Sequence, residues 1–108
     1  MNISDIAVKT GIKPMNAFTD KEVAGVYISD MVSDIITSAR PNCILITLQT
    51  HKSLIAAANL VSVAMIIVVK GRRPADDVIQ LATNAGIGLF TCDQDTWSIA
   101  RKLVDLGF

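Results

Sequence analysis

The stretch CILITLQTH, residues 43–51, decides the fold class of this chain. Its first five residues form an uncharged and mostly apolar run, as expected of a strand that is buried on both faces of a parallel sheet. The stretch then becomes polar, and a helix-like spacing of apolar residues follows at 54–61. A buried strand followed by polar residues and then by a helix is the repeating unit of an α/β domain.

The same order of features recurs along the rest of the chain. Three more apolar runs are expected to form strands, and each ends in polar residues ahead of a helix-like pattern. These runs lie at 22–28, 65–69 and 87–91, and the polar groups after them are Ser29-Asp30, Lys70-Gly71-Arg72-Arg73-Pro74 and Cys92-Asp93. Because parallel strands end at one edge of a sheet, we expect these groups to gather there, where open α/β folds bind ligands.

The sequence therefore predicts a single three-layer α/β domain over residues 1–108, with a mostly parallel sheet of about four to five strands flanked by helices. Residues 1–21 are expected to form an N-terminal helix and an edge segment broken by Pro14, and residues 22–108 the α/β core. The order of the strands does not follow from the sequence, because crossover handedness restricts topology without determining it.

Short polar residues and glycines mark the expected ends of the helices. The predicted helix starts are at Ser4 or Asp5, Ser29 or Asp30, Thr50, Pro74 with Asp76 and Asp77, and Asp93 or Asp95, and the predicted stops are Gly11, Gly86 and Gly107. Helical spacing also predicts which side chains face inward. These are Met31, Val32, Ile35, Ile36 and Ala39 in one helix, and Trp97, Ala100, Leu103 and Val104 in the last one.

The composition excludes several classes of protein. Ten basic and ten acidic residues cancel, so the chain lacks the basic excess of a typical nucleic-acid binder and a polybasic patch for membranes. Residues 4–12 are similar to the first half of a DNA-binding helix-turn-helix, but no recognition helix follows them. The sequence thus predicts neither a nucleic-acid nor a membrane partner.

The core and the compartment also follow from composition. Hydrophobic residues make up 51% of the chain and aromatic ones 5%, which predicts an aliphatic core and suits burial of further surface in an oligomer. Cys43 and Cys92 are predicted to be buried thiols, without a disulfide framework or the spacing of a zinc site. With neither a signal-peptide pattern nor a long apolar span, we expect a cytoplasmic protein.

The group Lys70-Gly71-Arg72-Arg73-Pro74 is the best candidate for an anion site. A strand end, a flexible glycine, two guanidinium groups and the start of a helix are expected to converge there. Arginine can hold a phosphate or a carboxylate through two parallel hydrogen bonds, and the backbone at a helix start attracts anions. The group is neither a phosphate-binding P-loop nor a dinucleotide fingerprint, and a solvated basic loop is the alternative.

Other polar residues at the same edge are candidates for ligand contact. Asp30, Thr50, His51 and Asp93 all follow apolar runs. His51, the only histidine, could equally be a first-turn helix residue with local hydrogen bonds. Aspartates in such places are more often helix caps than metal ligands, and no hydroxyl has an obvious activating base. The sequence therefore predicts no catalytic residue, no metal site and no cofactor.

Four segments give the chain a family resemblance. They are GVYISDMVSD at 25–34, ITLQTH at 46–51, IIVVKGRRP at 66–74 and DQDT at 93–96. Through them, residues 23–108 resemble the DRTGG domain family. Such domains occur as regulatory inserts in some phosphate acetyltransferases, between CBS domains of some inorganic pyrophosphatases, and as small stand-alone proteins, which this chain resembles. Where the family has Thr-Gly-Gly, this chain has Lys70-Gly71-Arg72, so only Gly71 carries over.

The resemblance implies a three-layer α/β domain that pairs with itself, and it supplies no catalytic residue. The leading hypothesis is a non-catalytic regulatory homodimer that senses an anionic metabolite or nucleotide. Arg72 and Arg73 would hold the anion, and Asp30, Thr50 and His51 would line the neighbouring loops. The alternatives are a protein–protein interaction module without a small ligand and, less favoured, a small phosphoryl-transfer enzyme, which would need a phosphate-cradling loop and a Mg²⁺ carboxylate.

Overall fold

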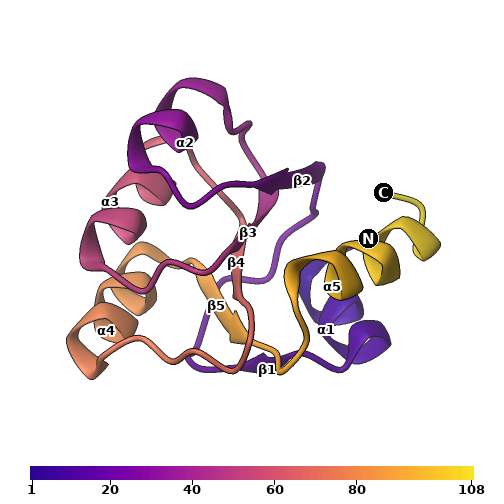
Figure 1. The fold of residues 1–108 in the computed structure, drawn as a ribbon. Helices are drawn as coiled ribbons and strands as arrows, with labels where there is room; N and C mark the ends of the chain where they lie inside the picture. Colours follow the sequence, from indigo (N-terminus) through magenta and orange to yellow (C-terminus); the bar gives the residue numbers. More distant parts are fainter.

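The chain forms five strands and five helices in the computed structural model, which describes all of residues 1–108, and strands and helices alternate from β2 onward (Figure 1). The strands are β1 (Lys13–Pro14), β2 (Gly25–Ile28), β3 (Cys43–Thr47), β4 (Met65–Val68) and β5 (Gly88–Thr91). The helices are α1 (Ile3–Thr10), α2 (Val32–Ser38), α3 (Lys52–Leu60), α4 (Asp76–Ala85) and α5 (Thr96–Asp105). The predicted α/β class and mostly parallel sheet are confirmed.

The five strands form one sheet in the order β1-β5-β4-β3-β2. Strands β2 to β5 are parallel neighbours in sequence order, and only the two-residue β1 runs antiparallel, beside β5. Pro14 cannot donate to a strand ladder, which explains why this edge segment is so short. The polar segments that follow the four parallel strands therefore lie in a row along one edge of the sheet.

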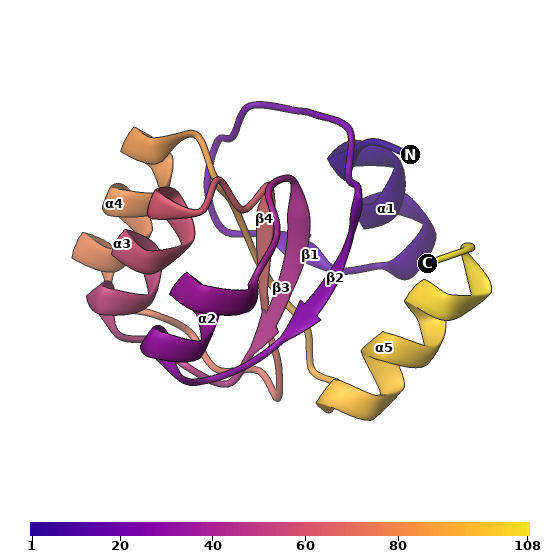
Figure 2. The same cartoon turned by 90° about the horizontal axis from the view of Figure 1, so that it is seen from above.

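Helices cover both faces of the sheet, which makes the three predicted layers (Figure 2). Helices α2, α3 and α4 pack on one face, and α1 and α5 on the other. Successive side chains of the inner strands alternate between the two faces: Leu45 and Ile66 join the first core, and Ile44 and Ile67 the second. All five residues of β3 are buried, as a central parallel strand requires.

Most helix ends lie near their predicted positions, with corrections at the caps. Gly11 and Gly86 end α1 and α4 in left-handed backbone, and Asp95 caps α5 by accepting a hydrogen bond from the Ser98 amide. The predicted starts at Ser4 or Asp5, at Thr50 and at Pro74 are wrong by one to three residues. The observed N-cap residues there are Asn2, His51 and Ala75.

The predicted inner faces of two helices need a larger correction. In α5, Ile99 and Leu103 are buried, whereas Trp97 and Val104 are 70% and 64% exposed. In α2, only Ile35 is buried, because this seven-residue helix covers the margin of the sheet and leaves Met31 and Ile36 outside. Helical spacing alone could not separate the buried from the exposed apolar residues of these two segments.

The remaining structural predictions concern the thiols and the membrane. Both cysteines are free; Cys43 is buried and Cys92 is half-buried. None of the helices combines the length and apolar character that crossing a membrane requires.

Candidate functional site

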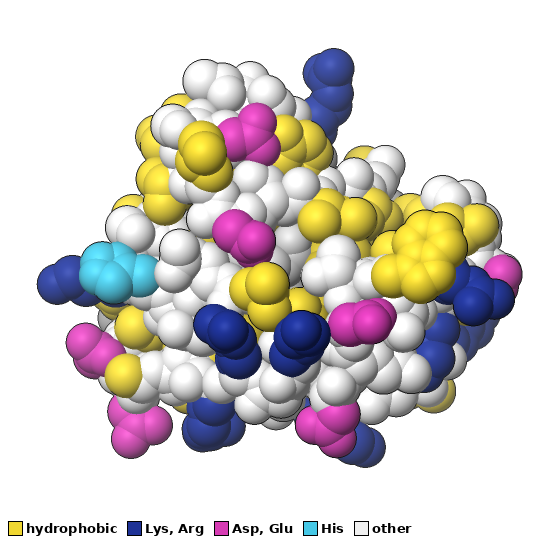
Figure 3. All heavy atoms as spheres, viewed as in Figure 1, with side chains coloured by type: hydrophobic (Ala, Val, Ile, Leu, Met, Phe, Trp, Pro, Cys, Tyr) yellow, Lys and Arg dark blue, Asp and Glu magenta, His cyan; other side chains and the backbone are white.

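Four loops meet at the carboxyl edge of the parallel sheet. Residues 29–31 follow β2, 48–51 follow β3, 69–75 follow β4 and 92–95 follow β5. Figure 3 views this edge, with the histidine at its left, basic side chains near its centre, and acidic side chains close by. The loops fall into two pairs that differ in how their polar groups are bonded, and we call them the β2–β3 pair and the β4–β5 pair.

Asp30 holds the β2–β3 pair together. Its Oδ1 accepts hydrogen bonds from the Thr47 hydroxyl (2.9 Å) and from the Leu48 amide (2.7 Å). Thr47 Oγ1 in turn accepts from the Gln49 amide at 3.0 Å, and Gln49 Nε2 donates to the Asp30 carbonyl at 3.4 Å. Asp30 therefore does not cap α2, contrary to one prediction, and its carboxylate instead ties the end of β2 to the end of β3.

A tight turn organises the β4–β5 pair. Lys70 and Gly71 both adopt left-handed backbone, with φ of 61° and 66°, and the Arg72 amide donates to the Val69 carbonyl at 3.3 Å. Two successive left-handed residues with this bond are the geometry of a type I′ turn. Glycine adopts this conformation readily, but lysine does so at a cost, and strain of this kind clusters at functional sites.

The same turn is bonded to the loop after β5. The Lys70 amide donates to the Gln94 carbonyl (2.9 Å), and the Gly71 amide donates to the Cys92 carbonyl (2.8 Å). Asp93 lies over the turn, with its Oδ1 3.4 Å from where a Cβ on Gly71 would be. The structure thus brings Lys70, Gly71 and Asp93 together, as the sequence predicts for residues of neighbouring strands.

Arg72 and Arg73 carry two adjacent unpaired charges at this edge. Both are exposed, and neither makes an ion pair or donates a side-chain hydrogen bond. The start of α4 was expected to help these arginines to attract an anion, but acidic residues already occupy it. Helix α4 begins at Asp76, and its first turn already carries the carboxylates of Asp76 and Asp77. An anion here would be held by the guanidinium groups.

Thr50 and His51 end the loop after β3, on the side of the β2–β3 pair that neighbours the β4–β5 pair. His51 is exposed and caps α3: its Nδ1 accepts from the Ser53 amide at 3.2 Å and lies 2.9 Å from the Ser53 hydroxyl. The local hydrogen bonds of the alternative interpretation are therefore present, but His51 makes them from the N-cap position and not from the first turn of the helix. Because Nδ1 accepts, the other ring nitrogen remains for a ligand. Thr50 is half-buried and has no side-chain hydrogen bond.

A hollow of about 240 Å³ adjoins the β4–β5 pair. Asp93 and Gln94 line it on one side, and the segment from Thr10 to Lys13 lines it on the other. Two cations, Lys13 and Lys102, also border it, and Lys102 Nζ donates to the Thr10 carbonyl at 3.3 Å. The sequence does not point to this hollow, because α1 and β1 reach β5 only through the fold.

Sequence reasoning also missed the role of Thr47 in the β2–β3 pair. Thr47 is 1% exposed, and its hydroxyl joins Asp30 to Gln49 by hydrogen bonds. From the sequence, a single hydroxyl at the end of an apolar run indicated only the end of a strand. Its one signal is that it is the only polar residue of an otherwise apolar strand.

The titratable groups near this edge are not set up for nucleophilic chemistry. Burial raises the pKa of the Cys92 thiol at this edge and of the Cys43 thiol at the opposite end of β3, which keeps both protonated near neutral pH. A hydrogen bond from Tyr27 is the largest cause that lowers the pKa of Asp34, and the Ser98 amide does the same for Asp95, so both carboxylates are ionised. No three histidine, cysteine or acidic side chains lie close enough together to hold a metal ion.

Comparisons with known proteins agree with this architecture. A family model described as the DRTGG domain matches residues 14–106. A solved structure containing the CBS and DRTGG domains of the regulatory region of a Clostridium perfringens pyrophosphatase, complexed with the activator diadenosine tetraphosphate, has a similar fold. The TM-score is 0.74 at 20% identity, over 94% of this chain and 45% of that one, so this chain spans less than half of it. The search of curated proteins found no match.

Proposed function

The chain belongs to the DRTGG domain family, and from this we propose that it is a non-catalytic regulatory domain that senses an anionic metabolite or nucleotide and acts as a homodimer. The ligand would bind at the carboxyl edge of the sheet, over the β4–β5 pair of loops. Arg72 and Arg73 would hold its anionic group. Lys70, Gly71 and Asp93 would form the wall beside it, and Thr50 and His51 the border toward β3.

One observation carries this proposal: two adjacent, exposed guanidinium groups without any carboxylate partner, beside a strained turn at the carboxyl edge. Arginine binds phosphate through two parallel hydrogen bonds, and a dianionic group can bridge two arginines. The β2–β3 pair is a poorer place for an anion, because the Asp30 carboxylate is itself negative and already accepts two hydrogen bonds within the chain.

The description of the similar pyrophosphatase region supports the chemical class of ligand. Its activator, diadenosine tetraphosphate, is a polyanionic nucleotide, and it is attributed to a regulatory region that contains CBS domains as well. A phosphate-bearing ligand for the present domain is therefore a reasonable first choice. The raised thiol pKa values and the use of His51 Nδ1 in a helix cap support a binding role over a catalytic one.

A thermal-shift screen tests the proposal. The probes are ATP, AMP, diadenosine tetraphosphate, acetyl phosphate and coenzyme A, each with and without Mg²⁺. A ligand at a hundred times its Kd stabilises the fold by about 2.7 kcal/mol, which raises the melting temperature by several degrees. In the Arg72→Ala, Arg73→Ala double variant we expect this shift to be lost.

The Lys9→Ala, Lys21→Ala double variant is the matched control, because it removes two cations outside this edge and changes the net charge equally. It should retain the shift. Equal binding by all three proteins would overturn the assignment of the arginines, and the absence of any shift with every probe would overturn the sensing function.

A protein-interaction role without a small ligand remains the second candidate. A specific observation favours it, because large apolar side chains on β2 and α5 are exposed. A domain of that kind would show no thermal shift and would still associate with a partner.

A further inference from the structure

We infer that the free edge of β2, together with the outer face of α5, is the surface through which two copies of this chain associate. The inference rests on the homodimer of the proposed function and assigns its interface. In Figure 1, β2 lies at the top of the sheet and β1 at the bottom, so Figure 2, seen from above, looks onto β2. No strand pairs with the outer side of β2, and no helix passes over it.

The two edge strands differ in how they are protected against pairing. Natural edge strands carry charges, prolines or bulges, or they are very short. Strand β1 has a lysine, a proline and a length of only two residues. Strand β2 is four residues long, Gly25-Val26-Tyr27-Ile28, and carries none of these devices. An unprotected edge is a template for a further strand.

Exposed apolar side chains adjoin this unprotected edge. Ile28 on β2 is 52% exposed, and Trp97 and Val104 on α5 are 70% and 64% exposed. A hollow of about 300 Å³ between β2 and α5 is lined only by hydrophobic residues, namely Val26, Ile28, Ala100, Leu103, Val104 and Phe108. Figure 3 shows hydrophobic side chains gathered in this region, over β2 and α5.

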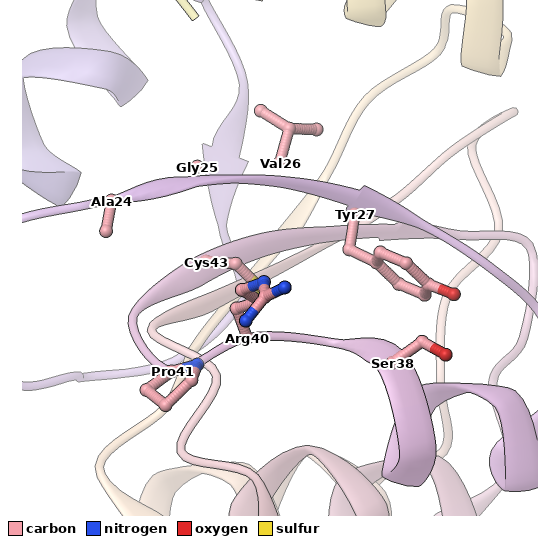
Figure 4. A pocket seen from close by; sticks show the side chains of 8 residues that line it. All are labelled: Ala24, Gly25, Val26, Tyr27, Ser38, Arg40, Pro41 and Cys43. Atoms are coloured by element: carbon pink, nitrogen blue, oxygen red, sulfur yellow. The ribbon is translucent and has the colours of Figure 1, made fainter.

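A second hollow, of about 430 Å³, lies on the other face of β2 (Figure 4). Tyr27 borders it from the strand, and Ser38 and Arg40 border it from the end of α2 and the following loop. Because side chains alternate along a strand, a strand added to β2 would direct its residues in turn into the two hollows. The site thus accepts a strand, with pockets for both of its faces.

A second copy of β2 fits this site by symmetry. Antiparallel pairing about a two-fold axis at Tyr27 places Val26 of each copy opposite Ile28 of the other, on the α5 side. The apolar residues then cover one another, and the two sheets become continuous. The chain has no net charge, and the rim at Arg101 and Asp105 carries one charge of each sign, so two copies do not repel each other.

A stable dimer would cover only part of the surface of this chain. A standard interface covers roughly 800 Å² on each partner, and this chain exposes 5547 Å² in all. A large aromatic side chain presents roughly 150–250 Å², so Trp97 contributes a substantial part. Strand β2, the hollow beside it and the outer face of α5 would together supply this surface.

Sedimentation of the full chain at concentrations from about 1 to 100 µM tests the inference. We expect the wild type to dimerise, and the Ile28→Lys, Val104→Lys double variant to dimerise at least tenfold more weakly, since four lysines would meet at the interface. The control is Leu60→Lys, Leu81→Lys, which changes residues that are 69% and 43% exposed on α3 and α4. This control should dimerise like the wild type, and circular dichroism checks that all three proteins fold.

Trp97 is the only tryptophan, so its emission reports on the proposed interface itself. It should shift to shorter wavelength as the wild type associates and stay unshifted in the Ile28→Lys, Val104→Lys variant. A wild type that stays monomeric would contradict the homodimer of the proposed function. A dimer that resists both lysines, or forms without a change in Trp97 emission, would overturn only the surface assigned here.

Discussion

The two pairs of loops at the carboxyl edge each contain an aspartate just after a strand, but they differ in whether their charged groups are bonded within the chain. Asp30 follows the end of β2 by two residues, and Asp93 follows the end of β5 by two residues. Asp30 accepts two hydrogen bonds and ties two strands together, whereas Asp93 accepts none and lies over an exposed turn. Beside Asp93, the charges of Arg72 and Arg73 stay unpaired.

This difference separates stability from recognition. Polar groups that satisfy one another within the chain stabilise the fold and have little left to offer a ligand. Charges that the fold leaves unpaired contribute little to stability and remain available for binding. We therefore assign the β2–β3 pair to structure and the β4–β5 pair to ligand binding, and each of the following experiments sharpens or breaks that division.

The largest expected effect on stability is at Asp30. Replacing Asp30 with alanine leaves the buried Thr47 hydroxyl and the Leu48 amide without a partner, which costs about 1–3 kcal/mol of unfolding free energy. Asp93→Ala is the matched control and should stay within about 0.5 kcal/mol of the wild type. Urea denaturation at pH 7 measures both. Equal losses in the two variants would contradict the division.

A smaller loss is expected at the turn of the β4–β5 pair. Gly71→Ala forces a Cβ into left-handed backbone at φ of 66° and toward Asp93, which costs roughly 1–2 kcal/mol. Gly25→Ala is the control, because open space surrounds that position and its φ is not left-handed. Thermal unfolding should show a lower melting temperature for the first variant only. If both variants melt alike, the turn is not strained as described.

The pH dependence of the unfolding free energy should reveal the hydrogen bond between Tyr27 and Asp34, which lies beside the β2–β3 pair. The Tyr27 hydroxyl donates to Asp34 at 2.7 Å, and this bond is the main cause that lowers the pKa of the carboxyl. A lowered folded-state pKa adds stability above the ordinary carboxyl pKa, and this stability is lost as the pH falls through the folded value. Below about pH 4, the wild type should therefore lose stability more steeply than Tyr27→Phe. Parallel acid limbs in urea titrations would contradict this.

The smallest effect on stability is expected from the arginines. The Arg72→Ala, Arg73→Ala variant should unfold within about 0.5 kcal/mol of the wild type, because neither side chain makes a bond within the chain. The same variant should lose at least tenfold in affinity for a phosphate-bearing probe, since hydrogen bonds between charged groups contribute about 1.5–3 kcal/mol each. Chemical denaturation and calorimetric titration measure the two quantities. A large loss of stability would show that the arginines belong to the structural part.

The alternation of apolar runs and helical patterns was enough to predict the α/β fold, because each strand had to be buried on both faces. Strand order escaped prediction, and with it the hollow between β5 and the end of α1. Of the four residues predicted to face inward in α5, Leu103 is buried, whereas Trp97 and Val104 were predicted wrongly because they have the spacing of core residues and lie on the outer surface. The bonds of Asp30 could not be predicted either, since capping α2 was the local alternative and a partner on β3 decided the outcome.

Nuclear magnetic resonance titration of the isotope-labelled chain with ATP tests the central division most directly. We expect the amide signals of residues 70–73 and 92–94 to move with added ATP, with smaller changes at Thr50 and His51. The amides of Leu48 and Gln49, held by the Asp30 network, should stay in place. Movement centred on residues 29–31 and 47–49, with residues 70–73 unchanged, would contradict the account.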